Sequence, residues 1–359
     1  MPPEPRRPIR SVPPVVHGAL DFGELRCLGL DPDKVIDFSA NTNPYGPSPA
    51  VRAALIQVSL DRYPDREALA LCTALAESLG VAIGCLIAGN GASELIFLAA
   101  LAFVRPGDVV VVLGPTYGEY VRAARLMGGH LTLWQARAED DFQPDLMPFA
   151  CALERLRPRV VFVCNPNNPT GAVLRSDVLG RLVRRYPAAL FVVDEAYQPF
   201  AADFGSALDV AAENLLVLRS LTKDCGLAGL RLGYAVGPGP LVEALRRVQS
   251  PWSVNALAQA AGVAALGDPA HRARSLEMLA EAKAALTAGL TGLGLRPLPS
   301  AVPFFLVHVG DGAAFRHRLL TRGLLVRDCA SFGLPEHVRI STRRPEENER
   351  LLTAIREVL

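Results

Sequence analysis

The sequence predicts an α/β protein with a mainly parallel sheet that is covered by helices on both faces. Four short runs are apolar at every position, at residues 109–113, 160–164, 190–193 and 215–218. Continuous apolar runs of this length are typical of strands that are buried on both faces. Helical patterns separate the runs, as expected of βαβ units. Polar residues follow each run, at the sheet edge where such folds bind ligands.

Prolines and glycines divide the first eighty residues into short elements. Residues 1–16 are rich in proline and predict an extended or disordered arm. The stretch 41–49 contains three prolines and is therefore expected to be irregular. The other elements expected here are a short helix over 17–30, a strand over 35–39, and helices over 49–59 and 66–79.

A glycine-rich stretch, Ala88-Gly-Asn-Gly-Ala-Ser-Glu94, precedes an apolar run at 95–103. This pattern predicts a loop that leads into a helix N-terminus, where free backbone N–H groups and the helix dipole bind phosphate. A glycine-rich turn alone is weak support for such a site. The next helix begins near Tyr117 and Tyr120, and either ring could stack on a flat ligand. The phosphate donors expected in the loop are Gly91, Ala92 and Ser93.

The pattern changes after Gly237-Pro-Gly-Pro240. A long helical stretch follows, broken at 251–255, and continues to about residue 290. Three strand-like segments and a terminal helix come next, at 304–309, 324–327, 337–341 and 345–358. We therefore expect an N-terminal arm (1–40) that packs on the small domain or the active site, a large domain (41–250) and a smaller α+β domain (251–359).

Composition excludes several classes of protein. The chain has 359 residues and a net charge of +1, so neither a nucleic-acid footprint nor an acidic tail is indicated. Its seven cysteines are scattered without a C-x-x-C pair, which argues against a zinc site and fits a reducing cytosol. No apolar run approaches the length of a membrane helix, and the Pro/Arg-rich N-terminus lacks the apolar region of a secretory signal. We expect a cytoplasmic protein with no metal, nucleic-acid or membrane partner.

Lysine is rare in this chain, and one lysine lies in a distinctive setting. Only three lysines occur among 37 basic residues. Lys34 and Lys283 lie in segments typical of exposed surface. Lys223 ends the stretch Ser220-Leu-Thr-Lys, and a glycine-rich turn leads from it to Arg231. A lysine amine can form a Schiff base with an aldehyde cofactor, and hydroxyls with an arginine can bind its phosphate.

Further polar groups follow the other strands. Asp194 comes directly after an apolar run, so its carboxylate is expected to be partly buried and to need a partner. A protonated ring nitrogen would serve, and would make the ring an electron sink. Asn168 and Tyr197 could bind a phenolic oxygen on the same ring. Each residue alone is more commonly a cap, turn or core residue, so their order along the chain is the signal.

That order resembles the fold-type I pyridoxal-phosphate enzymes, the aspartate aminotransferase superfamily. The motifs are Asn165-Pro-Asn-Asn-Pro-Thr-Gly171, Asp194-Glu-Ala-Tyr197, and Ser220-x-Thr-Lys223 with Gly-Leu-Arg231-Leu-Gly-Tyr234. The resemblance extends from His17 to the C-terminus. It implies pyridoxal 5′-phosphate bound to Lys223 as a Schiff base, with Asp194 on the pyridine nitrogen and Asn168 and Tyr197 on the phenolic oxygen. The residues implied for the cofactor phosphate are Gly91, Ala92, Ser93, Ser220, Thr222 and Arg231.

Two groups in this superfamily resemble the chain: histidinol-phosphate aminotransferases and the threonine-phosphate decarboxylases of cobalamin synthesis. The segments 17–18, 37–44 and 219–223 are similar to the decarboxylases, and Pro251-Trp-Ser-Val-Asn255 is the most discriminating. We therefore expect decarboxylation of L-threonine O-3-phosphate to (R)-1-amino-2-propanol O-2-phosphate. The alternative is histidinol-phosphate aminotransferase, because Gly226-Leu-Ala-Gly resembles that group as much.

The resemblance also implies groups for the substrate. Arg339 matches the arginine that binds the α-carboxylate across the superfamily. Arg327 is the candidate for the substrate phosphate, together with His17, Ser39 and Asn43.

Tyr63 matches a tyrosine that reaches the cofactor of the neighbouring subunit, which implies a homodimer with shared active sites. The proton donor stays open between Lys223, water and Tyr63. A regulator that binds the cofactor without turnover is a weaker alternative, since only about 16 residues precede the enzyme-like segment.

Overall fold

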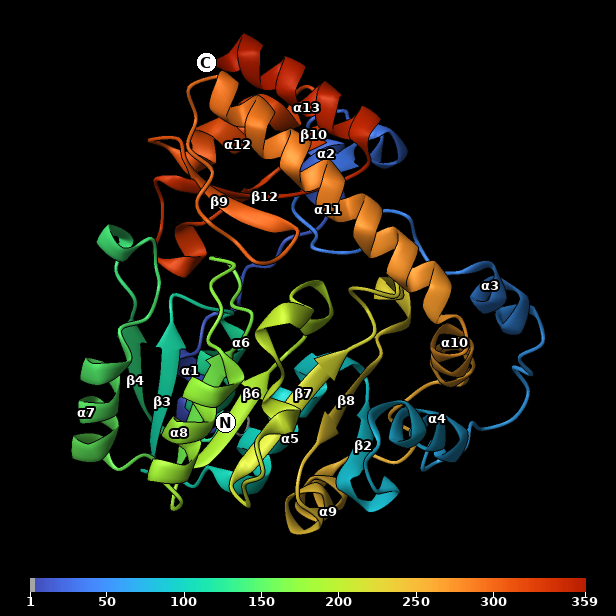
Figure 1. Cartoon of the computed structure of the whole chain (residues 1–359), viewed down its shortest axis with the longest axis vertical. Helices are drawn as coiled ribbons and strands as arrows, with labels where there is room; N and C mark the ends of the chain where they lie inside the picture. The colour runs from blue at the N-terminus through green and yellow to red at the C-terminus, as the bar shows by residue number, and fades with distance from the viewer. Residues whose placement is uncertain (1–3) are drawn as a thin grey trace.

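The computed structural model describes residues 4–359 and is built on a seven-stranded sheet, in the lower half of Figure 1. The strand order is β2-β8-β7-β6-β5-β3-β4. Strand β8 is antiparallel to both of its neighbours, and the remaining pairs are parallel. The strands are β2 (Leu86–Gly89), β3 (Val109–Gly114), β4 (His130–Gln135), β5 (Val160–Cys164), β6 (Leu190–Asp194), β7 (Leu215–Ser220) and β8 (Gly233–Val236).

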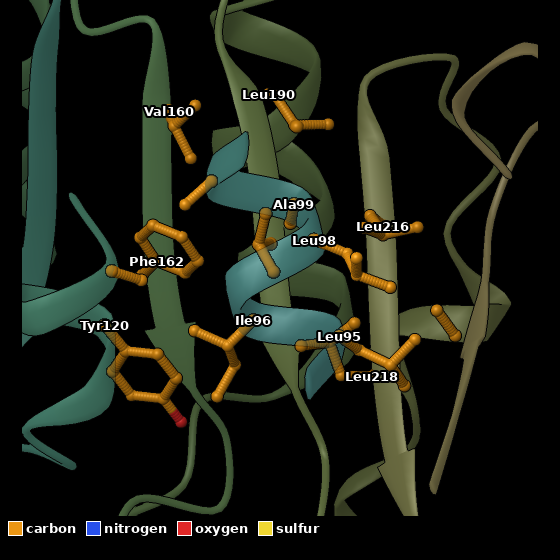
Figure 2. Packing of buried hydrophobic residues seen from close by; sticks show 14 of the residues in the cluster. Leu95, Ile96, Leu98, Ala99, Tyr120, Val160, Phe162, Leu190, Leu216 and Leu218 are labelled. Carbon is orange, nitrogen blue, oxygen red and sulfur yellow. The ribbon is translucent and has the colours of Figure 1, made fainter. Parts of the chain in front are cut away.

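Helices cover both faces of this sheet, and the central strands β5, β6 and β7 are buried at every position. In β5, Phe162 points to one face, where α5 (Gly91–Phe103), α6 (Glu119–Leu126) and α9 (Gly239–Val248) pack. Its neighbours Val161 and Val163 point to the other face, against α7 (Leu146–Leu156) and α8 (Ser176–Arg185). Figure 2 shows the first layer, with Leu95 and Ile96 of α5 above β5 and β7. The predicted α/β fold with a mainly parallel sheet is confirmed.

A second group of elements occupies the upper half of Figure 1. Its antiparallel sheet has the order β11-β12-β9 and packs with three helices, while α2 packs against α12 and β10. The N-terminal part joins this group, because β1 pairs in parallel with β10. The elements are α2 (Phe22–Cys27), β1 (Ile36–Asp37), α11 (Pro269–Gly292), β9 (Phe304–His308), α12 (Gly312–Leu320), β10 (Leu324–Leu325), β11 (Arg327–Asp328), β12 (His337–Ser341) and α13 (Pro345–Val358).

The remaining elements connect the two groups. Helices α3 (Pro49–Ile56), α4 (Leu69–Leu79) and α10 (Ala256–Leu266) pack together beside β2 and β8. Helix α1 (Arg7–Ser11) lies beside α6, on the seven-stranded sheet. Within residues 4–359, no helix is both long and apolar enough to cross a membrane. Short 3₁₀ helices lie at Pro32–Lys34, Ile83–Cys85, Ala138–Asp140, Gln198–Phe200, Ala202–Phe204, Ala207–Asp209, Ala228–Leu230 and Ala330–Phe332.

Several features differ from the sequence expectations. Residues 1–16 were expected to be extended or disordered, but helix α1 forms at Arg7–Ser11. The helix expected over 17–30 is limited to α2, because the Asp21 side chain accepts from the N–H groups of Gly23 and Glu24 and caps the helix there. Strand β4 was not predicted, since it is an edge strand with exposed positions and no continuous apolar run. Strands β2 and β8 are short and contain glycine, which weakens their sequence pattern. The three-domain division stays a prediction.

Candidate active site

A cavity of about 560 Å³ lies at the carboxyl ends of β3, β5, β6 and β7, where they meet the N-terminal segment and β11–β12. This is the sheet edge at which parallel α/β folds bind ligands. The predicted site residues that line the cavity are His17, Ser39, Ala92, Ser93, Tyr117, Tyr120, Asn168, Asp194, Tyr197, Ser220, Thr222, Lys223, Arg231, Arg327 and Arg339. Gly91, Asn43 and Tyr63 are not part of its lining.

Lys223 lies three residues beyond the end of β7, and its Nζ is 5.7 Å from the centroid of the Tyr197 ring. Burial, together with the positive charges of Arg339 and Arg231, lowers the pKa of the amine to about 8 against the opposing charge of Asp194. A lysine with this pKa is substantially neutral in mildly alkaline solution. The neutral amine is the form that attacks an aldehyde, so Lys223 has the chemistry that a Schiff-base lysine requires.

Asp194 is the last residue of β6 and is only 4% exposed. Its Oδ2 accepts a 2.7 Å hydrogen bond from the Tyr120 hydroxyl, and its Oδ1 accepts from the Ala196 N–H at 2.9 Å. Burial raises the pKa of this carboxyl despite those hydrogen bonds and the charge of Lys223. A carboxylate that burial destabilises in this way is stabilised by a cationic partner, and the protonated nitrogen of a pyridine ring fits that requirement.

The two tyrosines after β3, Tyr117 and Tyr120, make different contacts. The ring of Tyr120 stacks on Phe162, with centroids 5.5 Å apart, and its hydroxyl is committed to Asp194. The Tyr117 ring lines the cavity, and its hydroxyl lies 3.3 Å from the Ser93 hydroxyl. Tyr117 is therefore the tyrosine with a ring available to a flat ligand.

A group of hydroxyls and one guanidinium surrounds the N-terminus of α5. The Ser220 and Thr222 hydroxyls are 2.6 Å apart. Gly91 begins α5 with φ of +77°, and a Cβ atom there would lie 2.8 Å from the Arg231 guanidinium. Glycine is therefore needed for Arg231 to approach the helix end. Hydroxyls, a guanidinium and a helix N-terminus together form an anion site that fits a cofactor phosphate.

Polar side chains on the opposite side of the cavity retain unused hydrogen-bonding capacity. Arg339 donates to the side-chain oxygen of Asn168 and, at 2.5 Å, to the Ser39 carbonyl. The Asn41 amide donates to the Tyr197 hydroxyl at 3.3 Å. Arg339 Nε and Asn41 Oδ1 are buried and have no hydrogen-bond partner among residues 4–359, and both belong to side chains that line the cavity. Buried polar atoms of this kind are candidates for ligand contacts.

Asn43 has a different place from the one expected. Its amide nitrogen donates to the Asp224 carbonyl at 2.9 Å and to the Ser275 hydroxyl at 2.7 Å. These bonds attach the irregular segment 41–49 to the loop after β7 and to α11. Asn41, two residues earlier, lines the cavity instead. The sequence prediction selected Asn43 of this segment, whereas Asn41 is the asparagine that faces the cavity.

Tyr63 lies outside the cavity and is 77% exposed. Its ring stacks on Trp252, with centroids 4.6 Å apart. The prediction that Tyr63 reaches the cofactor of a neighbouring subunit stays a prediction.

The N-terminal segment closes one side of the cavity through Arg327. The two terminal nitrogens of this guanidinium donate to the His17 carbonyl at 3.2 Å and the Val16 carbonyl at 2.9 Å. Nη2 also donates to the Ser331 hydroxyl at 2.5 Å. The Ser39 hydroxyl accepts from the Ala19 N–H at 2.8 Å, so it too holds this segment.

Glu119 is a cavity residue that sequence reasoning missed. It begins α6, its carboxylate is buried, and Oε1 pairs with His17 Nε2 at 2.8 Å. The available signal was a carboxylate in Tyr117-Gly-Glu-Tyr120, directly after a predicted strand.

Comparison with known proteins shows the family. The sequence matches the aminotransferase class I and II family over residues 33–355. The histidinol-phosphate aminotransferase of Moorella thermoacetica is 38% identical over 99% of this chain and 93% of its own. That of Symbiobacterium thermophilum is 39% identical over 99% of this chain and 98% of its own.

Solved structures agree on the fold. Histidinol-phosphate aminotransferase from Sinorhizobium meliloti, in complex with pyridoxal-5′-phosphate, superimposes with a TM-score of 0.87 at 27% identity. The alignment covers 98% of this chain and 96% of that one. L-threonine-O-3-phosphate decarboxylase from Porphyromonas gingivalis gives a TM-score of 0.76 at 27% identity, over 89% of this chain and 98% of that one.

The expectation of threonine-phosphate decarboxylation is wrong, because relatives with identities of 35–39% are named histidinol-phosphate aminotransferases. The stretch 251–255 that suggested a decarboxylase lies outside the cavity. There Asn255 caps α10 and Trp252 is exposed, so the stretch reports local structure rather than reaction type. The fold-type I assignment and the pyridoxal 5′-phosphate cofactor are confirmed. This chain belongs to the aminotransferase class I and II family, and it uses pyridoxal 5′-phosphate.

Proposed function

We propose that this protein is a histidinol-phosphate aminotransferase, which exchanges an amino group between L-histidinol phosphate and a 2-oxo acid. The observation that carries the proposal is a pair of buried arginines beside Lys223. Arg327 of β11 and Arg339 of β12 are cross-strand partners, and both line the cavity. Burial lowers the pKa of both guanidiniums, yet arginine remains charged at neutral pH. Two fixed cations suit a substrate with a phosphate or a carboxylate.

The cofactor would be held by the groups that surround the cavity. Lys223 would bind it covalently, Asp194 would pair with the pyridine nitrogen, and Tyr117 would stack on the ring. Asn168 and Tyr197 would bind the phenolic oxygen; burial raises the pKa of Tyr197 to about 12, so its hydroxyl stays a donor. The phosphate would lie at the N-terminus of α5, among Ala92, Ser93, Ser220, Thr222 and Arg231.

Lys223 has a second task in this proposal. The bound cofactor withdraws electrons from the substrate and makes the proton on Cα acidic. The Lys223 amine, with its pKa of about 8, accepts that proton at Nζ and returns it later in the reaction. A base whose pKa lies near the working pH does both steps efficiently.

The two arginines divide the substrate anions. Arg327 binds the phosphate of L-histidinol phosphate, and Arg339 binds the α-carboxylate of the 2-oxo acid and supports the phosphate. Among residues 4–359, Arg339 Nε has no hydrogen-bond partner. The oxygens that accept hydrogen bonds from Arg327 are neutral, and the Asp328 carboxylate approaches its Nη1 only at 3.9 Å. Anionic acceptors make stronger hydrogen bonds to a guanidinium than neutral oxygens do.

The proposal includes a homodimer in the cytoplasm. Large apolar side chains are exposed around α3, α4 and the turn before α10, and exposed apolar patches commonly mark protein interfaces. These apolar side chains, with their exposed fractions, are Ile56 (81%), Leu60 (81%), Tyr63 (77%), Leu69 (58%) and Trp252 (45%).

The proposed cytoplasmic location is supported by the cysteines. All seven cysteines are free, as expected in a reducing compartment.

One assay tests the reaction. The holoenzyme is incubated with L-histidinol phosphate and 2-oxoglutarate, and glutamate is measured against reactions that lack either substrate. Glutamate should form only when both are present. A parallel reaction with L-threonine O-3-phosphate should release no CO₂. Failure to form glutamate from L-histidinol phosphate, with cofactor bound, would overturn the proposed substrate.

A further inference from the structure

Residues 15–19, the strap, lie along one side of the active-site cavity. Val15 rests on Gly118, where a Cβ atom would lie 2.8 Å from Val15 Cγ1. Arg327 holds the carbonyls of Val16 and His17, and Ser39 holds the N–H of Ala19. The strap carbonyls therefore accept hydrogen bonds from Arg327 N–H groups that face the substrate cavity.

His17 connects two oppositely charged groups of the cavity. Its carbonyl oxygen accepts from Arg327 Nη1 at 3.2 Å, and its Nε2–H donates to Glu119 Oε1 at 2.8 Å. Its ring lies beside the Tyr117 ring, with centroids 5.6 Å apart. A single histidine residue thus spans the distance from the guanidinium to the carboxylate, with its ring next to an aromatic face.

L-histidinol phosphate has the same carbon skeleton as a histidine residue. Both contain an imidazole, one methylene and a Cα that carries nitrogen. The carbon that forms the carbonyl in His17 carries the phosphate ester in the substrate. A substrate placed like His17 would put phosphate oxygens on Arg327 and its ring N–H on Glu119. The phosphate is the stronger partner for Arg327, because it is charged and the strap carbonyls are neutral.

Glu119 needs such a partner whenever the strap is absent. The residue is 3% exposed, and Arg122 Nη1 approaches its Oε2 at 3.3 Å. Burial raises the pKa of its carboxyl, but the hydrogen bond from His17 and the charge of Arg122 outweigh burial, so the pKa is lowered. An ionised carboxylate at this depth is costly when a hydrogen bond is missing. Removal of His17 leaves Oε1 without its donor until another N–H takes that place.

We propose that Glu119 is the residue that selects the imidazole ring of the substrate, and that His17 occupies its position as an internal substrate mimic until the substrate displaces the strap. The inference rests on the proposed function and extends it to the choice of side chain. A phenyl ring in the same place has no N–H and leaves Glu119 Oε1 without a donor. Sites built to hydrogen-bond a substrate group discriminate strongly against analogues that lack it.

The experiment compares two substrates on four holoenzymes. The substrates are L-histidinol phosphate and L-phenylalaninol phosphate, which differ in the ring and share the amine and phosphate. The enzymes are the wild type, Glu119→Gln, His17→Phe, and the control Glu139→Gln, whose carboxylate pairs with Arg137 on the surface. Steady-state kinetics gives kcat and KM for each, and calorimetry gives the dissociation constants.

Glu119→Gln should raise the KM for L-histidinol phosphate about tenfold, the difference between a charge-assisted and a neutral hydrogen bond, with kcat little changed. Its KM for L-phenylalaninol phosphate should stay within about twofold, so the ring preference shrinks. His17→Phe should lower the KM for L-histidinol phosphate and keep the ring preference, because the mimic is gone and Glu119 remains. Glu139→Gln should behave like the wild type.

If Glu119→Gln raises the KM for both substrates equally, Glu119 only anchors the strap, and the proposal is overturned. A ring preference lost in His17→Phe would overturn it as well. If the wild type transfers no amino group, the proposed function fails, and calorimetry then decides ring selection alone. Preferential binding of L-histidinol phosphate that disappears in Glu119→Gln would support ring selection, and its absence from the wild type would overturn it.

Discussion

The Tyr120 hydroxyl donates a 2.7 Å hydrogen bond to Oδ2 of Asp194, from a ring that stacks on Phe162 in the core. Figure 2 shows this hydroxyl at the edge of the packed cluster, beyond Ile96 of α5. The core between α5 and the sheet therefore fixes the position of a carboxylate that lines the cavity. If Asp194 pairs with the pyridine nitrogen as proposed, Tyr120 links cofactor binding to packing of the core.

Tyr120→Phe should weaken pyridoxal-phosphate binding about tenfold, because one hydrogen bond to a charged group is lost while the ring and its packing remain. Titration of the apoenzyme with cofactor measures the dissociation constant. Tyr186→Phe is the matched control, since that hydroxyl donates to the Ala150 carbonyl between α7 and α8. Equal affinities for the two variants would show that Tyr120 does not support Asp194.

Lys223→Ala should abolish the visible absorbance of covalently held cofactor and reduce turnover by roughly 10²–10⁴-fold, the range for a lost acid–base group. Lys283→Ala is a demanding control, because burial lowers the pKa of Lys283 to about 8 as well. Its Nζ donates to the Ser300 carbonyl at 2.5 Å, away from the cavity. Retained absorbance in Lys223→Ala, or its loss in Lys283→Ala, would contradict the assignment.

Cofactor incorporation into the apoenzyme should accelerate as the pH rises, with a midpoint near 8, because only the neutral Lys223 amine attacks the aldehyde. An unperturbed lysine would give a midpoint more than two pH units higher. Stopped-flow absorbance across this range measures the profile. Arg339→Gln removes a positive charge that lowers the pKa of Lys223, so its midpoint should move upward. A downward shift would contradict the electrostatic account.

The fold and the cofactor site could be predicted because both depend on local sequence patterns. Residues 160–164 of β5 and 190–193 of β6 are apolar at every position, and only a doubly covered sheet buries both faces of such a run. Asp194 ends β6 and Lys223 follows β7 by three residues, so strand prediction also placed them at one sheet edge. Their chemistry then indicated the cofactor.

The substrate side could not be predicted in the same way. Asn41 and Asn43 lie in a proline-rich segment without periodicity, and only the folded path shows that one faces the cavity and the other faces α11. Glu119 and His17 are far apart in sequence, and their contact depends on how the strap crosses α6. The reaction type was mispredicted from residues 251–255, which do not line the cavity.

The arginine pair gives the sharpest test of the phosphate site. Arg327→Gln should raise the KM for L-histidinol phosphate by about 10- to 100-fold, the equivalent of one charge-assisted contact, and should affect unphosphorylated L-histidinol far less. Its guanidinium also holds the strap carbonyls, so part of the cost of losing it is offset when the strap is released.

Arg296→Gln serves as the control for a lost arginine charge, because that side chain pairs with Asp141 on the surface. Steady-state kinetics with the two donors, at saturating 2-oxo acid, separates phosphate recognition from a general loss of activity. If Arg327→Gln impairs the phosphorylated and unphosphorylated donors equally, Arg327 holds the strap and not the phosphate. Arg339, its cross-strand partner, would then be the remaining cation for that anion.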